Sequence, residues 1–237
     1  MFDQTTSRLE LPLVQPGQAQ KHVTVNEALA RLDGMVNLVL VSITRTEPPA
    51  ASAEGACFGV PAGASGLWTG RDGQIAIAAN GGWDFCAPRS GMGAHITDQG
   101  VPAIHDGDGW VTGALTLAPS GAGLIARTAE AEVAITPGTT VETDLFIPSG
   151  VLVIGVTARV RVAISGTLTS WRMGVADGLD RFGGGLGLQA GSWARGLVSQ
   201  PYGNWSPEPV LLSATGGSFA AGGLVIAAHW LELGLPR

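Results

Sequence analysis

Residues 156–162 read Val156-Thr157-Ala158-Arg159-Val160-Arg161-Val162, and this alternation of apolar and polar side chains is the clearest structural signal in the chain. Successive side chains of a β-strand point to opposite faces, so the run predicts a strand with one face in a core and the other in solvent. The same period of two recurs at residues 130–135. Further strands are predicted at 36–44, 73–78, 83–86, 141–147, 167–173, 209–214 and 224–233.

The strands after residue 120 follow one another with glycine turns between them and without a convincing helix, which predicts a jelly-roll-like antiparallel β-sandwich over residues 120–237. Residues 1–115 form a smaller N-terminal domain with one helix and β-hairpins, and a low-charge stretch at 113–126 lies at the boundary. The fold class is therefore mainly β. We expect the first domain to attach and oligomerise, and the second to bind a glycan.

The one helix is predicted to begin at a capping box, Thr24-Val25-Asn26-Glu27, in which the Thr24 hydroxyl and the Glu27 carboxylate each accept from the other's backbone amide. Behind it, apolar residues at helical spacing face a polar side. The apolar set is Val25, Ala28, Leu29, Leu32 and Met35, and the polar set is Asn26, Arg31 and Asp33.

Three glycine turns each precede a tryptophan, at Gly66-Leu67-Trp68, Gly81-Gly82-Trp83 and Asp108-Gly109-Trp110. We interpret all three as small hairpins. Asp106-Gly107-Asp108-Gly109 has the composition that opens a calcium loop. The twelfth position, however, is Leu117 where a bidentate glutamate is needed, so a hairpin turn is the better interpretation.

Composition argues against several function classes. The net charge of −6 and the absence of a Lys/Arg cluster in the sequence argue against nucleic-acid binding. The apolar runs are shorter than the roughly 20 residues that cross a bilayer, so no membrane insertion is expected. Two cysteines favour free thiols over a bridge. We find no catalytic motif, no metal-ligand spacing and no cofactor signature, although a glycosidase carboxylate pair stays open.

The segment from residue 171 to 205 combines tryptophan, the single tyrosine and polar side chains with glycine. Flat rings stack on the C–H face of a sugar, and polar groups bind its hydroxyls. Trp171 and Trp193 could instead fill the core, whereas Tyr202 and Trp205 are expected to be exposed in a loop. The candidate glycan-binding residues are Trp205, Tyr202, Asn204, Trp193, Arg195, Asp180 and Arg181.

Residues 15–22, Gln-Pro-Gly-Gln-Ala-Gln-Lys-His, with Asn26-Glu27-Ala28-Leu29 after them, resemble the opening of a domain family of unknown function found in phage and gene transfer agent proteins. The resemblance continues through Trp68-Thr69-Gly70, Gly82-Trp83-Asp84-Phe85 and Gly109-Trp110, and covers about residues 8–112. The second half, with Asp180-Arg181-Phe182-Gly183 and Gly216-Gly217-Ser218-Phe219, is similar to a domain that often follows it.

The resemblance implies a head spike or tail fibre of a phage-like gene transfer agent, which attaches to cell-surface capsular polysaccharide and contacts structural proteins of the capsid vertex or tail. A purely structural spike base is the alternative, and a polysaccharide-degrading enzyme is the third. No signal-peptide pattern begins the sequence, so we expect the bacterial cytoplasm during assembly and then the released, extracellular particle. Weak single sugar sites favour a homo-oligomer, a trimer or alternatively a pentamer. Residues 11–22 are either an arm on a neighbouring subunit or a loop on their own domain.

Overall fold

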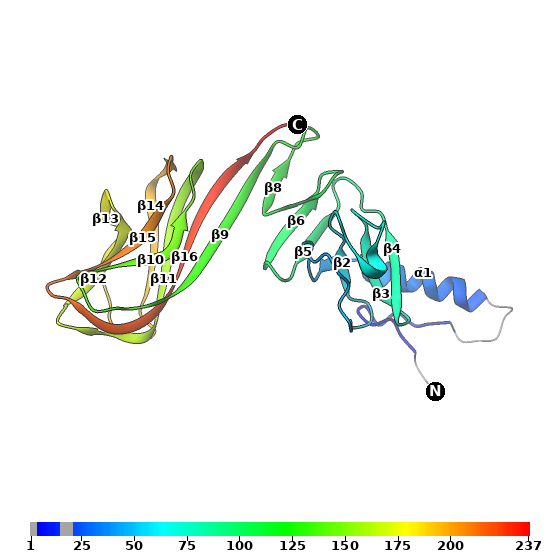
Figure 1. The fold of residues 1–237 in the computed structure, drawn as a ribbon, viewed down its shortest axis with the longest axis horizontal. Coiled ribbons are helices and arrows are strands. Elements are labelled where there is room, and N and C mark those ends of the chain that lie inside the picture. Colours follow the sequence, from blue (N-terminus) through cyan, green and yellow to red (C-terminus); the bar gives the residue numbers. More distant parts are fainter. Residues whose placement is uncertain (1–3, 15–20) are drawn as a thin grey trace. The chain divides into compact units, whose positions relative to one another are not determined.

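The computed structural model describes residues 4–14 and 21–237 (Figure 1). The chain divides into two compact units, Met1–Gly121 and Ala122–Arg237. Both are built mainly of β-strands, and the one α-helix of the described residues lies near the N-terminus, so the predicted fold class is confirmed. That helix is not long and apolar enough to cross a membrane. The roles predicted for residues 1–115 and 120–237 stay predictions.

The first unit has one sheet with the strand order β4-β3-β2-β1-β5-β6-β7, in which β1 pairs in parallel with β2 and β5 and the other pairs are antiparallel. Its elements are α1 (Lys21–Met35), β1 (Val39–Leu40), β2 (Cys57–Gly59), the 3-10 helix η1 (Gly66–Trp68), β3 (Ile75–Ala79), β4 (Gly82–Cys86), β5 (Gly93–Ile96), β6 (Val101–His105), β7 (Trp110–Thr112) and β8 (Ala114–Leu117).

The predicted helix exists, but the predicted capping box is wrong, because α1 begins at Lys21 and Thr24 lies inside it. The apolar stripe is also less buried than expected, since Leu32 is 49% exposed while Asp33, assigned to the polar side, is 2% exposed. The reason is the segment 4–14, which packs on that side. The Asp33 carboxylate accepts hydrogen bonds from Thr6 Oγ1 at 2.7 Å and from the Leu9 amide at 2.6 Å.

The predicted arm at residues 11–22 falls partly outside the described residues, because 15–20 are not among them. Residues 4–14 bind their own unit: the side chain of Asn26 donates to the carbonyl oxygen of Val14 and accepts from its amide. The helix itself lies close to β3, since a Cβ added at Gly34 would come within 2.8 Å of Ile77 Cδ1. Glycine at this position therefore allows the close approach.

Two of the three predicted glycine-tryptophan hairpins are confirmed. Trp83 lies in β4 after a tight turn at Asn80-Gly81, where both residues have positive φ, and Trp110 opens β7 after the turn at 106–109. The prediction of a hairpin at Gly66-Leu67-Trp68 is wrong. Trp68 is fully buried in a 3-10 turn and packs edge-on against Trp83, with ring centroids 5.2 Å apart, because a ring of this size fills the space beside the sheet.

The strand predicted at 36–44 is observed only over Val39–Leu40. Asn37 has φ of 46° in the turn after α1, so the chain is not extended from residue 36.

The two cysteines are free: Cys57 is buried and Cys86 is half-buried. Burial raises the pKa of the Cys57 thiol to about 11, so it stays protonated at neutral pH.

The second unit contains two antiparallel sheets, with the strand orders β14-β11-β16-β9 and β10-β15-β12-β13. Its strands are β9 (Gly123–Ala134), β10 (Thr140–Ile147), β11 (Val151–Gly166), β12 (Ser170–Val175), β13 (Gly178–Leu186), β14 (Trp193–Asn204), β15 (Glu208–Thr215) and β16 (Phe219–Gly234). The predicted strands at 130–135, 141–147, 156–162, 167–173, 209–214 and 224–233 are found in β9, β10, β11, β12, β15 and β16.

One core lies between the two sheets, and both contribute to it. Its fully buried side chains are Ile147, Val153, Val156, Met173, Val175, Val210, Leu212, Ile226 and Ala228. Strands β13 and β14 were not predicted, because their glycine-rich sequence has the composition of a loop. Consecutive strands of the unit pass from one sheet to the other several times, which supports the jelly-roll type. That finer type stays a prediction.

Trp171 is a core residue of this sandwich, as one of the two interpretations of the sequence had it. Its side chain is 2% exposed, and its Nε1–H donates to the Gly187 carbonyl at 2.9 Å. Trp171→Ala should lower the free energy of unfolding by about 3–5 kcal/mol, because it removes a large buried ring and a hydrogen bond. Urea unfolding checks this. Phe146→Ala, at a half-exposed ring on β10, is the control and should cost about 1 kcal/mol or less.

Candidate functional site

Strand β14 brings most of the sequence-predicted glycan residues onto one element, and its pleat divides them between two faces. Trp193 and Arg195 point to solvent, whereas Asn204 is buried. We call the solvent-facing side of the β14-β11-β16-β9 sheet the outer face, because its other side lines the core. Trp205 follows β14 directly and is 88% exposed, as expected for this ring.

Trp193 and Arg195 lie beside two further arginines on the outer face. Arg159 is the cross-strand partner of Trp193, and Thr157 is the partner of Arg195. Arg161 lines the same shallow groove of about 380 Å³, and so does Glu130 of β9. We call Arg159, Arg161 and Arg195 the arginine cluster. The Arg195 guanidinium carbon lies 5.8 Å from the centre of the Trp193 ring, within cation–π range.

The arginine cluster is exposed and has no ion-pair partner among the described residues. Two carboxylates lie on the same face, but two strands away. Glu130 and Glu132 of β9 are cross-strand partners of Ala227 and Val225, which in turn pair with Thr157 and Arg159. Since neighbouring strands are about 4.8 Å apart, roughly 10 Å separates the two strands that carry the opposite charges.

His229 lies midway along the outer face. Its ring nitrogens lie 3.1 Å from the Thr128 hydroxyl on one side and 3.1 Å from the Thr157 hydroxyl on the other. Both ring nitrogens therefore have a hydrogen-bond partner. Burial lowers the pKa of His229 below its ordinary value.

The far end of the outer face is apolar. Trp205 lines a hollow of about 260 Å³, and the leucines that line it with Trp205 are Leu124, Leu152, Leu231 and Leu233. A Cβ at Gly203 would lie 3.4 Å from the Trp205 ring, so the ring covers this glycine. Along β11, the partners of Asn204 and Trp193 are Val151 and Arg159, and a strand rises about 3.3 Å per residue. The backbone of Trp193 and that of Asn204, which precedes Trp205, are therefore roughly 25 Å apart along the strand.

Arg181 and Tyr202 form a separate cluster. The Arg181 guanidinium pairs with the Asp177 carboxylate at 3.0 Å and lies over the Tyr202 ring at 4.6 Å. Tyr202 is half-buried against the core, in a strand rather than in the predicted exposed loop. Burial raises the pKa of Tyr202, and burial together with the nearby Asp177 raises the pKa of Glu208. Asp180 is exposed on β13.

Asn204 has a structural role in place of the predicted ligand contact. Its side-chain amide nitrogen lies within hydrogen-bond distance of the carbonyl oxygens of Ile147 (3.1 Å), Pro148 (2.9 Å) and Ser206 (2.7 Å). The side chain points inward because position 204 is on the core side of the pleat. It fixes the turn at residues 148–150 to the end of β14.

Sequence reasoning missed Arg159, Arg161, Thr157 and His229 as parts of the outer face. The signal was present, because Arg159 and Arg161 alternate with the buried Ala158 and Val160 in the run that predicted the strand, although Val162 at the end of the run is 63% exposed. What the sequence lacked was the pairing of β11 with β14, which places these arginines beside Trp193.

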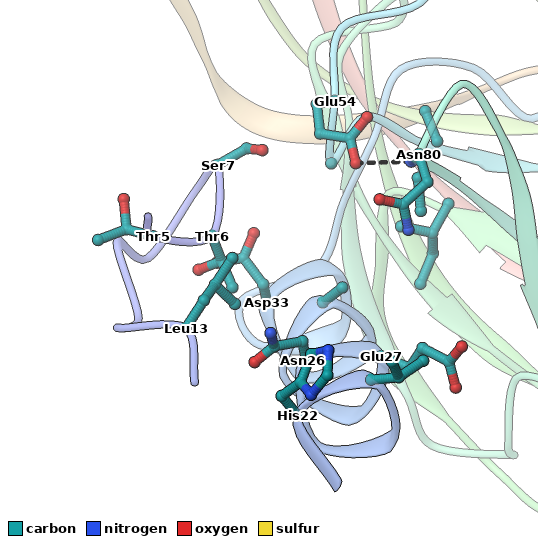
Figure 2. Close-up of a pocket in the computed structure, with 16 residues that line it drawn as sticks. Thr5, Thr6, Ser7, Leu13, His22, Asn26, Glu27, Asp33, Glu54 and Asn80 are labelled. Carbon is teal, nitrogen blue, oxygen red and sulfur yellow. Dashed lines mark hydrogen bonds between the residues drawn. The ribbon is translucent and has the colours of Figure 1, made fainter. Parts of the chain in front are cut away.

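The first unit has its own hollow, of about 280 Å³, between the segment 4–14, α1 and β3 (Figure 2). Its polar groups hold the unit together. Asp33 binds the segment 4–14, and the Glu54 carboxylate accepts a hydrogen bond from the Asn80 amide at 2.8 Å. Within residues 4–14 and 21–237, no group of three or more His, Cys, Asp and Glu side chains is arranged to hold a metal.

One comparison with known proteins matches part of the first unit. Residues 25–111 match the family described as protein of unknown function DUF2793. This segment coincides with most of the region on which the sequence resemblance rests. A chain from the cyanophage Pam1 capsid asymmetric unit is similar at 20% identity with a TM-score of 0.34, covering 45% of this chain and 84% of that chain. A TM-score of that size does not establish a shared fold. No curated protein matches the chain.

The lowered pKa of His229 gives the second unit a pH dependence. As the pH falls through about 6.5, the ordinary pKa, the unfolded chain binds a proton before the folded one does, so the free energy of unfolding decreases. His105 of the first unit acts in the same direction. We therefore expect His229→Gln to lose less stability than the wild type between pH 7.5 and pH 5 in urea unfolding. Equal losses in the two proteins would contradict the assignment.

Proposed function

We propose that the second unit binds a linear polysaccharide along the outer face of the β14-β11-β16-β9 sheet, with Trp193 and Trp205 as two stacking platforms. The observation that carries the proposal is the exposure of two tryptophans, 64% and 88%, on the same face of one sheet. Burying such a ring is strongly favourable, so a protein that leaves two of them in solvent on one face keeps them for a ligand.

The chemistry between the two rings fits sugar. Trp193 and Trp205 offer flat faces to pyranose C–H groups. The Thr128 and Thr157 hydroxyls between them each use one hydrogen bond on His229 and keep further hydrogen-bonding capacity for a sugar. The backbone separation of roughly 25 Å along the strand is longer than one sugar ring and suits an extended polymer. Trp193 lies on a paired strand, which holds its ring in place better than a loop does, and Trp205 directly follows the end of the same strand.

We further propose that the chain is a spike or fibre subunit of a phage-like particle, of the gene transfer agent kind. The support is the resemblance of residues 8–112, and the first unit would then attach to structural proteins of the particle while the second presents the glycan-binding face. The capsid vertex and the tail are both open as its place. In this proposal the protein is made in the cytoplasm, leaves on the particle, and binds capsular polysaccharide without cleaving it.

Substitution of the two rings tests the binding face. Trp193→Ala and Trp205→Ala should each weaken binding about tenfold or more, because stacking on an aromatic platform is worth roughly 1–3 kcal/mol by analogy with nucleic-acid bases. The measurement is biolayer interferometry on immobilised bacterial capsular polysaccharides, chosen with a glycan array. Melting temperatures should change little, since both rings are exposed.

Phe146→Ala is the matched control, because Phe146 is a half-exposed aromatic on the other sheet of the same unit and its loss should leave binding unchanged. Wild-type binding to none of the polysaccharides would favour the purely structural spike base. Undiminished binding by both tryptophan variants would place the site elsewhere.

We also propose a homo-oligomer, a trimer or alternatively a pentamer. Helix α1 of the first unit leaves Val25 and Leu32 exposed, at 42% and 49%, and the two lie on the same side of the helix because they are seven residues apart. Apolar side chains exposed on one side of a helix are typical of a surface that a second copy covers. Several copies would also multiply a weak sugar affinity. Multi-angle light scattering of the full chain at micromolar concentration should give three or five times the monomer mass. A monomer would contradict the proposal.

A further inference from the structure

We infer that the polysaccharide is acidic, and that the arginine cluster beside Trp193 binds its carboxylate groups. The inference rests on the proposed function and names the class of ligand for the same face. It depends on an observation separate from the two exposed rings: Arg159, Arg161 and Arg195 line one groove with the single carboxylate of Glu130, and none of the ion pairs found among the described residues includes these arginines.

Such a gathering costs free energy in the absence of an anion. Arg159 and Arg161 lie on β11, and Arg195 lies on the adjacent β14, so like charges are held on neighbouring strands, where they repel one another. The chain as a whole carries −6, with 13 cationic against 19 acidic side chains. A groove with three arginines and one carboxylate, Glu130, is therefore a local arrangement in an acidic protein, and it does not follow from composition.

Three arginines elsewhere in the chain have carboxylate partners. Arg31 pairs with Asp84, Arg127 with Glu232 and Arg181 with Asp177. In each of these pairs a carboxylate of the protein contacts the guanidinium. At the arginine cluster, we infer that a carboxylate of the ligand takes this role. The planar guanidinium fork matches a carboxylate in two parallel hydrogen bonds, so an acidic sugar is the partner whose shape fits.

The acidic groups on the same face favour a glycan over a nucleic acid. Glu130 and Glu132 accept hydrogen bonds when ionised, and they need donors. Sugar hydroxyls supply donors next to a carboxylate, whereas the phosphodiester backbone of DNA has none and would be repelled. Three arginines and one tryptophan are also too few for the row of cations that tracks a nucleic-acid backbone.

The two ends of the outer face then divide the polymer between them. Near Trp193, an acid sugar stacks on the ring while its carboxylate contacts the arginines. At the other end, the leucines around Trp205 give an apolar surface for the hydrocarbon face of a sugar or its methyl and acetyl groups. The face is therefore polarised along β11, with charge recognition at one end and apolar contact at the other.

The test compares acidic polysaccharides with the same polymers after chemical reduction of their carboxyl groups to alcohols. The probes are alginate, hyaluronan, polygalacturonate and acidic capsular polysaccharides, measured by biolayer interferometry with the full chain. We expect the acidic form of at least one polymer to bind tenfold or more tighter than its reduced form. Raising sodium chloride from about 0.05 to 0.5 M should remove most of that difference, because salt screens exposed charges.

Arginine variants assign the effect to the cluster. Arg159→Gln and Arg195→Gln should each weaken binding of the acidic form about three- to tenfold and leave the weaker binding of the reduced form unchanged. Arg89→Gln is the matched control, because it removes the same charge from an exposed position in the first unit. Unchanged melting temperatures will show that the variants are folded.

The outcomes separate the inference from the proposed function. Equal binding of acidic and reduced polymers, or unaltered binding by both cluster variants, overturns the inference while the polysaccharide proposal stands. If only neutral polysaccharides bind, the inference is likewise overturned while the polysaccharide proposal stands. Duplex DNA that competes as well as the acidic polymer would make the face a general polyanion surface and overturns the inference. Absence of binding to every polysaccharide, acidic or neutral, contradicts the proposed function itself.

Discussion

Burial of one side of the β14-β11-β16-β9 sheet against the β10-β15-β12-β13 sheet determines what the other side can present. The inner positions of β11, such as Val153 and Val156, are fully buried. Because the side-chain period of a strand is two, a slip of one residue would bring the arginines into the core and the valines into water. The cost of burying unpaired charge therefore locks the register, and the register in turn places Arg159 beside Trp193.

Glycine makes this register possible at one point along β11. A Cβ at Gly155 would collide with the backbone of Gly196 on β14, and the pairing of the two strands shifts between Val153 and Gly155. The shift is a bulge, which bends the strand and changes which residues face outward. The bulge lies between the apolar end of the outer face and the arginine cluster. The alternation of inward and outward side chains therefore changes phase between the two ends.

The sequence allowed prediction where alternation was uninterrupted. The run at 156–162 predicted both the strand and its exposed arginines, and prolines and glycine at residues 201–207 predicted the exposed Trp205. Strands β13 and β14 were missed because glycine weakens the alternation, although backbone pairing with neighbours suffices to form them. Asn204 and Tyr202 were placed in a loop for the same reason, and their inward direction follows from the pleat of a strand that was not predicted.

The predictions of where the helix begins and which side it buries were wrong for a different reason. A capping box at Thr24 is a local pattern, and the tertiary contact of Asp33 with the segment 4–14 lies on the side that periodicity assigned to solvent. A buried carboxylate with three short hydrogen bonds is stable only in that context, because its desolvation must be offset by donors far away in the sequence. Nothing local to α1 could have indicated it.

In the proposed function, the sheet gives the outer face a particular kind of affinity. Trp193 and the arginines lie on paired strands and Trp205 directly follows one, so binding would cost little backbone entropy, and the side chains would lose only their own freedom. The contacts themselves are exposed, however, and exposed charge pairs contribute about 1 kcal/mol or less. One outer face should therefore bind a polymer weakly and release it quickly. A polymer with many equivalent sugars compensates, because a chain that leaves one site meets the next copy of the protein before it diffuses away. Weak sites on a rigid face are thus useful to a protein that acts in several copies, and much less so to one that acts alone.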